Sequence, residues 1–398
     1  MSIHLALKGG IPVREDFLPF FKHSIGSEEI NEVIDTLKSD WITTGPKTKK
    51  FEEKFCDYTG AKNAVAVNSC TAGLHLSLAA HDIGPGDEVI TSPYTFAATI
   101  NVIIHTGARP VLVDINKNTF NIDENLIEEA LSPRTKAIIP VHFAGYPCNM
   151  DKIKNIAEKK HLIVIEDAAH ALGAKYGNQK IGTIGDTTCF SFYATKNITT
   201  GEGGMITTNS EKIAEKMRIM SLHGISKDAY KRYSSEGSWF YEILCPGFKY
   251  NMTDIQASMG IHQLEKLDLM QARREEIARK YSEKLRHISE IRIPSIPDTI
   301  THAWHLYPLL IHTELLTVDR AQFIEALRAE NIGASVHFIP LHLHPYYRHY
   351  YSDRTMDLQN SEYIYSRELS LPLYPAMSDQ DSEDVITSII KIVDFYRK

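Results

Sequence analysis

Short apolar runs rich in Val and Ile alternate with amphipathic stretches between residues 60 and 208. The runs predict buried strands, and the helical periodicity of the stretches between them predicts helices. The expected strands cover residues 64–68, 87–91, 110–114, 136–141, 162–166, 188–192 and 205–208. The expected helices between them cover residues 71–80, 95–105, 122–131 and 150–159. Alternation of this kind predicts an α/β fold, with a mostly parallel sheet of about seven strands flanked by helices.

The pattern changes at both ends of the chain. Residues 1–26 form an irregular apolar arm, which we expect to lie across another surface, such as that of a partner subunit. Helices are expected at residues 27–37, 47–59 and 210–222, and a long one at 253–287. Beyond it we expect strands at 304–311 and 335–338 and helices at 320–330 and 379–396. We therefore divide the chain into an arm with a large domain (1–252) and a connecting helix with a smaller C-terminal α+β domain (253–398).

Composition excludes several classes of protein. With 398 residues and a formal net charge of −7, the chain is not expected to have a general affinity for nucleic acid or anionic membranes. No apolar run approaches the roughly 18 residues that span a bilayer, and the first residues do not resemble a signal peptide. Five dispersed cysteines without a C-x-x-C pair indicate reduced thiols. These features predict a cytoplasmic protein.

Polar residues follow two of the expected strands at their carboxyl ends. Asp167 closes the run 162–166, and Ser191 and Lys196 close or follow the run 188–192. Ligands of open α/β sheets lie at these strand ends. Each residue alone has an ordinary explanation: a surface lysine, a helix cap or a backbone hydrogen bond. Together they suit pyridoxal phosphate, because the carboxylate can keep the pyridine nitrogen protonated and the lysine can form the Schiff base.

Two further positions suit the same cofactor. Asn68-Ser69-Cys70-Thr71-Ala72-Gly73 joins a strand to a helix, and small residues at a helix N-terminus offer N–H groups to a phosphate. Phe96 begins the next helix, where it could stack on a ring or belong to the core. Neither signal is specific when taken alone.

The order and spacing of these residues resemble fold-type I pyridoxal phosphate enzymes. More narrowly, the chain is similar to the DegT/DnrJ/EryC1/StrS family of nucleotide-sugar aminotransferases, and within it to the UDP-4-amino-4-deoxy-L-arabinose–oxoglutarate aminotransferase. The motifs that carry this resemblance run nearly end to end: Trp41-Ile42-Thr43-Thr44-Gly45-Pro46, Ile165-Glu166-Asp167-Ala168-Ala169-His170, Lys196-Asn197-Ile198-Thr199-Thr200-Gly201-Glu202-Gly203-Gly204, Pro246-Gly247-Phe248-Lys249-Tyr250-Asn251-Met252-Thr253-Asp254-Ile255 and His302-Ala303-Trp304-His305-Leu306.

The resemblance implies a role for each matching residue. Lys196 would form the Schiff base and move the proton, Asp167 would pair with the pyridinium nitrogen, and His170 would contact the 3-oxygen. The phosphate would be held by Thr71, the Ala72 N–H, Ser191 and Asn251, the last from the second subunit. Phe96 would stack on the ring. Thr43, Thr44, Tyr193 and His337 are expected to line the substrate site.

Three histidines, His337, His342 and His344, lie close together in the sequence. We expect no metal there, because no cysteine or carboxylate accompanies them. Gly201-Glu202-Gly203-Gly204 matches neither the G-x-G-x-x-G fingerprint nor a P-loop, which argues against a nucleotide-binding protein.

The resemblance implies amino transfer from L-glutamate, giving 2-oxoglutarate, to the keto carbon (C4) of a nucleotide-linked, UDP-type keto sugar. The related 3-dehydratases carry His in place of the lysine, so Lys196 argues against dehydration. A C3-specific aminotransferase and a non-catalytic regulatory protein on the same fold are the alternatives. Because Asn251 and the arm would complete a neighbour's site, we also expect a homodimer.

Overall fold

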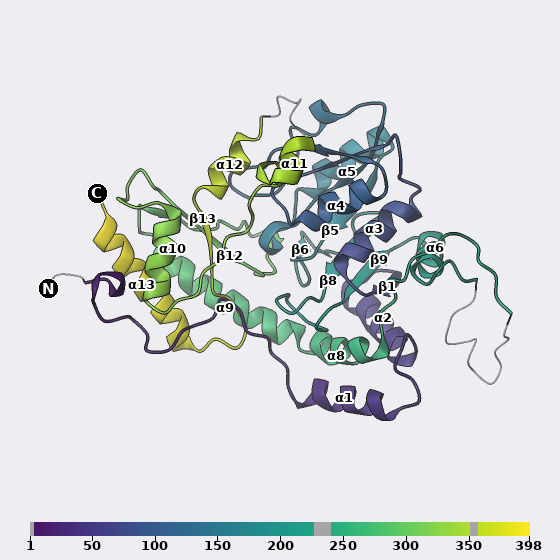
Figure 1. Ribbon diagram of the computed structural model, residues 1–398, viewed down its shortest axis with the longest axis horizontal. Coiled ribbons are helices and arrows are strands. Elements are labelled where there is room, and N and C mark those ends of the chain that lie inside the picture. Colours follow the sequence, from purple (N-terminus) through teal and green to yellow (C-terminus); the bar gives the residue numbers. More distant parts are fainter. Residues whose placement is uncertain (1–3, 227–239, 351–356) are drawn as a thin grey trace.

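A seven-stranded sheet forms the centre of the computed structural model, which describes residues 4–226, 240–350 and 357–398. Its strands follow the order β1-β9-β8-β5-β4-β2-β3, of which β1, β9, β8 and β5 are labelled in Figure 1. They comprise β1 (Asn63–Val67), β2 (Glu88–Thr91), β3 (Arg109–Leu112), β4 (Thr135–Ile139), β5 (Ile163–Asp167), β8 (Thr187–Ser191) and β9 (Gly204–Thr208). Neighbouring strands from β3 to β8 pair in parallel, and β9 runs antiparallel to both of its neighbours. The predicted mostly parallel sheet is therefore confirmed.

Helices cover both faces of this sheet. One face packs against α2 (Pro46–Thr59), α5 (Met150–Lys160) and α8 (Asp254–Glu265), with Phe51 and Phe55 at its centre. The other packs against α3 (Cys70–Ala80), α4 (Ala97–His105) and α6 (Glu211–Ser221). Successive strand residues point to opposite faces, so Val164 joins the first core and Ile165 the second. Nearly every strand residue is buried, as the continuous Val/Ile runs predicted.

A second core forms around a three-stranded antiparallel sheet. Its strands are β10 (Ile291–Arg292), β12 (Tyr307–Ile311) and β13 (Glu368–Leu371). The remaining helices are α1 (Ser27–Lys38), α9 (Leu267–Leu285), α10 (Arg320–Ala329), α11 (Pro345–Tyr350), α12 (Gln359–Tyr365) and α13 (Asp379–Tyr396). Short 3-10 turns occur at Ala6–Lys8, Glu128–Ala130, Phe143–Gly145 and Leu341–Leu343, and a third small sheet contains β6 (Lys175–Tyr176), β7 (Gln179–Lys180) and β11 (Ile300–Thr301). The predicted domain division at residues 252 and 253 stays a prediction.

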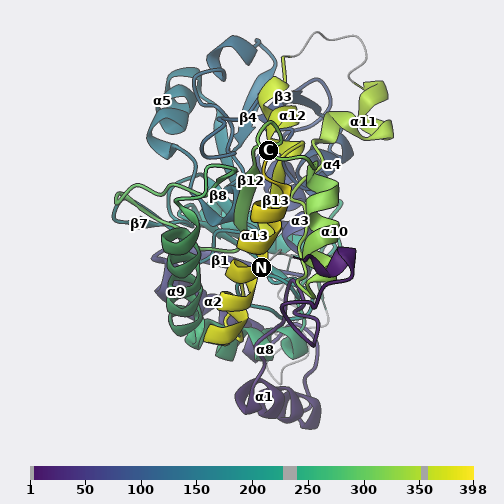
Figure 2. The same cartoon turned by 90° about the vertical axis from the view of Figure 1, so that its left-hand side faces the viewer.

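The N-terminal arm packs on the second core of its own chain. Leu5 is fully buried in that core, and the first turn lies against α10 (Figure 2). The buried carboxylate of Glu330 accepts the N–H groups of Ala6 and Val13, each at 2.9 Å. Leu18 pairs with Ile332 as a short parallel bridge. Residues 5–18 are therefore held largely by intrachain contacts.

The predicted helix at residues 122–131 is wrong. Ile115 pairs with Ile122 in a tight hairpin, and the Asp123 N–H donates to Asp114 O. The side chain of Asp123 then accepts the N–H of Asn125. Such local side-chain bonds compete with helix formation, and only a 3-10 turn at Glu128–Ala130 remains.

Two other predicted elements differ from the structure. The helix expected at 253–287 consists of α8 and α9, which meet at Lys266. The strand expected at 335–338 is reduced to a single bridge between Ser335 and Ser370. The N–H of His337 donates instead to a carboxylate oxygen of Glu368, which ends the strand pairing.

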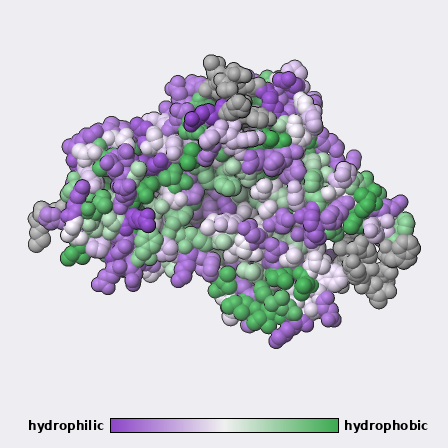
Figure 3. All heavy atoms as spheres, in the orientation of Figure 1, coloured by the Kyte–Doolittle hydropathy of each residue, from purple (hydrophilic) through white to green (hydrophobic). Residues whose placement is uncertain are grey.

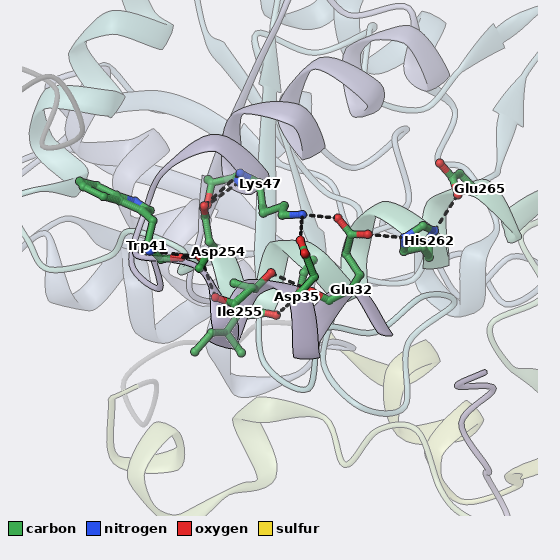
Figure 4. Close-up of polar contacts among 12 residues, drawn as sticks. Glu32, Asp35, Trp41, Lys47, Asp254, Ile255, His262 and Glu265 are labelled. Carbon is green, nitrogen blue, oxygen red and sulfur yellow. Dashed lines mark hydrogen bonds and ion pairs between the residues drawn. The ribbon is translucent and has the colours of Figure 1, made fainter. Parts of the chain in front are cut away.

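The carboxylate of Asp254 joins α8 to the first turn of α2 (Figure 4). It accepts the N–H groups of Gly45, Lys47 and Thr48 at 2.8–3.0 Å and the Thr48 hydroxyl at 2.6 Å. These N–H groups belong to a helix start, where no intrahelical partner exists. One buried carboxylate therefore caps a helix more than 200 positions earlier.

Replacing this carboxylate should destabilise the fold. Asp254→Ala leaves the buried donors of the α2 start without an acceptor. We therefore expect the free energy of unfolding, measured in urea, to fall by about 2–4 kcal/mol. Asp268→Ala is the matched control, because its carboxylate accepts one exposed hydrogen bond from Tyr58. Equal effects of the two substitutions would contradict the capping role.

Candidate active site

Two neighbouring carboxyl groups end β5 on opposite faces of the sheet. Glu166 lies on the face covered by α5 and is fully buried. Its oxygens accept Nε2–H of His142 at 2.9 Å, the Thr188 hydroxyl at 2.6 Å and the Gly185 N–H at 2.7 Å. Burial alone would raise the pKa of Glu166, but these donors hold it below its usual value. Glu166 is therefore an ionised scaffold group.

Asp167 points to the opposite face, toward α4. Its Oδ2 accepts the Thr99 hydroxyl at 2.8 Å, and its Oδ1 accepts the Ala169 N–H at 3.2 Å. Burial raises the pKa of Asp167, and these hydrogen bonds together with the charge of Lys196 oppose the shift. A cation placed against this carboxyl would therefore be strongly favoured.

Lys196 follows β8, the strand beside β5. Its own N–H donates to Tyr193 O at 2.9 Å in a turn after the strand. Burial lowers the pKa of the Lys196 amine to about 8, while Cys70 and Asp167 act in the opposite direction. An amine with this pKa is partly unprotonated near neutral pH, as a nucleophile must be. The structure thus places Lys196 and Asp167 close enough for each charge to shift the pKa of the other group.

Aromatic and imidazole rings surround this pair. His170 is buried, and its Nδ1 accepts the Ala144 N–H at 3.2 Å, so its ring hydrogen is on Nε2. Burial, with the charge of Lys196, lowers the pKa of His170 well below its usual value and keeps the ring neutral. The ring lies 4.2 Å from that of His305 and 5.9 Å from that of Phe338. A neutral Nε2–H donor is what contact with an anionic oxygen requires.

The turn into α3 lies against the first residue of β9. Ser69 caps α3, and its hydroxyl accepts the Ala72 N–H at 3.1 Å, so this predicted phosphate donor also serves the helix cap. Thr71 is exposed on the first turn of α3. A Cβ on Gly204 would come within 2.6 Å of Ser69 C and Cys70 N. Ser191, half-buried, is paired with Gly204 across the two strands.

Another group of predicted residues gathers beside β1. Asn251 pairs with Val67 of its own chain, and its side-chain amide donates to the Thr44 hydroxyl at 2.7 Å. The Thr43 carbonyl accepts the Asp254 N–H. A cavity of about 910 Å³ opens beside Thr44 and Asn251, away from Lys196. That Asn251 completes a second subunit's site stays a prediction.

Three predicted residues remain: Phe96, Tyr193 and His337. Phe96 is 63% exposed, and its ring lies 6.2 Å from that of Phe338. Tyr193 is also exposed. The charge of Lys196 contributes to lowering the pKa of His337, so the two side chains lie near each other.

Sequence reasoning did not identify several neighbours of the site. Thr99, Cys70 and Phe338 contact or influence predicted residues, and so do Glu368 and Ser370 through His337. A polar Thr99 within an apolar helix, and a lone Glu368 beside Leu-Ser-Leu-Pro-Leu, were the available signals. Neither residue indicates its hydrogen-bond partner, because that partner lies far away in the chain.

The residues present fit pyridoxal phosphate. The buried Asp167 carboxyl would be stabilised in its charged form by a protonated ring nitrogen, and the Lys196 amine with its lowered pKa suits an aldehyde. The α3 start and Ser191 lie on the sheet face that Asp167 occupies. Within the described ranges, every helix is too short or too polar to cross a bilayer.

Comparisons with known proteins place the chain in a family. Residues 23–390 match the DegT/DnrJ/EryC1/StrS aminotransferase family. The chain is 63% identical to the uncharacterized protein MJ1066 of Methanocaldococcus jannaschii, over 96% of this chain and 99% of that protein. It is 55% identical to the spore coat polysaccharide biosynthesis protein SpsC of Bacillus subtilis, over 96% of this chain and 98% of that protein.

A solved structure agrees. The PMP form of the putative sugar aminotransferase Spr1654 from Streptococcus pneumoniae superposes with a TM-score of 0.88 at 36% identity, covering 95% of this chain and 99% of that one. The predicted fold-type I architecture is thereby confirmed, while the particular similarity to the arabinose enzyme stays a prediction. The chain belongs to the DegT/DnrJ/EryC1/StrS aminotransferase family and is an enzyme of the transferase class.

Proposed function

We propose that this enzyme uses pyridoxal phosphate to move an amino group from L-glutamate to the keto carbon, C4, of a UDP-linked keto sugar, leaving 2-oxoglutarate. The observation that carries the proposal is the placement of Lys196 and Asp167 at the ends of two adjacent parallel strands. Burial lowers the pKa of the Lys196 amine, which favours the unprotonated nucleophile, and it leaves the Asp167 carboxylate without water, so that an adjacent cation stabilises its charge. When bound, pyridoxal phosphate supplies an electron-withdrawing ring conjugated to the reacting carbon.

The chain's own residues then have distinct tasks. Asp167 holds the ring nitrogen in its protonated form, and Thr99 orients that carboxylate. The Nε2–H of His170 donates to the 3-oxygen, because its Nδ1 is already an acceptor. Thr71, Ala72 and Ser191 would hold the phosphate, with Asn251 of a neighbouring subunit, and Phe96 would contact the ring. The Lys196 amine moves the proton at the substrate carbon.

The sugar substrate is supported by the relatives. SpsC is named for spore coat polysaccharide biosynthesis, and Spr1654 is named as a putative sugar aminotransferase. We infer that Thr43, Thr44, Tyr193 and His337 contact the nucleotide-linked sugar. The choice of UDP and of C4 rests on the motif similarity to the arabinose enzyme.

We further infer a homodimer that acts in the cytoplasm. Helix α1 presents its polar residues Glu29 and Thr36 to its own chain and leaves Ile30, Ile34 and Leu37 exposed. These three residues belong to the hydrophobic patch over α1 in Figure 3. An apolar helix face turned toward solvent is typical of an interface. All five cysteines are free thiols, which suits a reducing compartment.

Cofactor capture should depend on pH through Lys196. Wild-type protein mixed with pyridoxal phosphate should develop a visible absorption band that borohydride removes, and Lys196→Ala should not. The rate should rise with pH and level off above about 8, where the amine is unprotonated. Asp167→Asn should lower the midpoint of this pH dependence, because the Asp167 carboxylate favours the charged form of the Lys196 amine. Stopped-flow absorbance measures the rates.

Lys175→Ala, at an exposed lysine of β6, is the control and should behave as wild type. A wild-type protein without the band, even with excess cofactor, would favour the regulatory alternative.

Substrate choice can be read from product masses. UDP-, GDP- and dTDP-linked keto sugars are incubated with L-glutamate, and amination replaces the keto oxygen by an amine. We expect the UDP-linked 4-keto sugar to give the largest conversion. Turnover of C3-keto sugars alone would overturn the C4 assignment.

The dimer can be tested on α1. Ile30→Asp with Leu37→Asp should lower the molar mass measured by light scattering and reduce activity, since charges on an interface core prevent burial. Leu315→Asp, at an exposed position before α10, should leave the mass unchanged. Stable, fully active wild-type monomers on dilution would refute the shared site.

A further inference from the structure

A buried carboxyl group lies behind His337 at the start of β13. Glu368 is fully buried, and the other residues of β13 are Leu, Ser and Leu. Its Oε2 accepts the backbone N–H of His337 at 3.0 Å, and its Oε1 is 2.6 Å from the Ser370 hydroxyl. A buried carboxyl group without a salt-bridged cation is costly to keep charged. Its protonation state therefore matters to whatever it contacts.

The hydrogen bonds continue from Ser370 to the imidazole. Ser370 Oγ lies 2.9 Å from Nδ1 of His337, so Glu368, Ser370 and His337 form a continuous chain. The ring of His337 is fixed from its other side by Phe20, at 5.5 Å between ring centroids. With Nδ1 engaged by Ser370, Nε2 is the ring nitrogen left to meet a ligand.

The chain of hydrogen bonds has two self-consistent arrangements. With Glu368 ionised, Ser370 donates to Oε1 and accepts Nδ1–H of His337, which leaves Nε2 as an acceptor. With Glu368 protonated, Oε1–H donates to Ser370, and Ser370 donates to Nδ1, which places the ring hydrogen on Nε2. Oε2 stays an acceptor in both, because the backbone N–H of His337 can only donate.

We propose that Glu368 and Ser370 are positioning residues that decide which ring nitrogen of His337 carries the hydrogen, and so whether Nε2 donates to the substrate or accepts from it. The proposal rests on the proposed function in one respect, that the ligand at Nε2 is the keto sugar. Beyond the proposed function, it states whether Nε2 of His337 donates or accepts the hydrogen bond to the sugar. A sugar carbonyl or phosphate oxygen needs the Nε2–H form, whereas a hydroxyl can also donate to the bare nitrogen.

The surroundings set the pH at which the arrangement changes. Burial raises the pKa of Glu368 to about 8, against the hydrogen bonds from Ser370 and His337 and the charge of Arg320. Burial, with the charge of Lys196, lowers the pKa of His337 to about 4, so its ring is neutral throughout. The groups that face the two residues are Arg320 and Tyr94 at Glu368, and Lys196, His170 and His305 at His337. Near neutral pH the Nε2–H donor form therefore prevails, and above about pH 8 the acceptor form replaces it.

Glu368→Gln should lock the donor form. The backbone N–H of His337 needs an acceptor, so the amide oxygen of Gln takes the place of Oε2. The amide NH₂ then takes the place of Oε1 and donates to Ser370, as the protonated acid does. Ser370→Ala removes the link itself. Glu290→Gln is the control, because that carboxylate contacts Arg397 and not His337.

The tautomer can be measured without turnover. Protein labelled with ¹⁵N-histidine is examined by long-range ¹H–¹⁵N correlation between pH 6 and 9.5, and His337→Gln identifies the signal among the 18 histidines. Wild type and Glu290→Gln should change from the Nε2–H to the Nδ1–H form with a midpoint near pH 8. Glu368→Gln should keep Nε2–H at every pH, and Ser370→Ala should lose the pH response.

A wild-type ring whose tautomer is constant over this range would overturn the proposal. So would a change of tautomer that persists in Glu368→Gln or in Ser370→Ala. Should one variant fail to fold, the other still decides.

Kinetics supply a separate readout on the loaded enzyme. The KM for the keto sugar in wild type should rise about three- to ten-fold from pH 7 to 9, the range expected for one hydrogen bond, and stay nearly flat in Glu368→Gln. A KM that is equally pH-dependent in both proteins would contradict a substrate contact at Nε2. A protein that never forms the visible band would refute the proposed function, while the tautomer measurement would still stand.

Discussion

The hydrogen bond between His142 and Glu166 is the contact on which the site's geometry depends. His142 follows β4 and Glu166 ends β5, and both side chains are completely buried. The Cys148 N–H donates to Nδ1 of His142, which leaves Nε2–H to donate to Glu166. This contact ties together two strand ends, and removal of either partner would leave the other buried without it. The backbone of Asp167 is tied to the same segment, because its N–H donates to Pro140 O and its C=O accepts the His142 N–H.

The alternation of β5 separates two carboxyl groups that are adjacent in sequence. Glu166 is surrounded by donors and has a lowered pKa, whereas Asp167 has fewer donors and a raised pKa. Glu166 thus stabilises the scaffold. The charge of Asp167 is only partly compensated, and Lys196 lies near enough to act on it. Glu368 repeats this second situation on the smaller sheet, behind His337. The site is accordingly bordered by buried acids whose ionisation depends on what is placed against them.

Local patterns predicted the strands and the polar residues at their ends, because short apolar runs bounded by turn residues are typical of buried strands. They failed where side chains replaced backbone partners. Asp123 took the N–H of Asn125 and shortened an expected helix, and Glu368 took the N–H of His337 and ended an expected strand. Thr99 could not be matched with Asp167 from sequence, since their contact joins elements 68 positions apart. Periodicity identifies elements, whereas long-range hydrogen bonds depend on how those elements pack.

Gly204 shows how closely the start of α3 packs on β9. Its Cα lies so close to Ser69 and Cys70 that a single methyl group would overlap their backbone atoms. Gly204 also begins β9, the strand that runs against the direction of the rest of the sheet. The start of α3 therefore rests on the backbone of β9, the strand beside the edge strand β1, with no side chain between them to yield. Any sliding or twisting of β9 would therefore move the N-terminus of α3 with it.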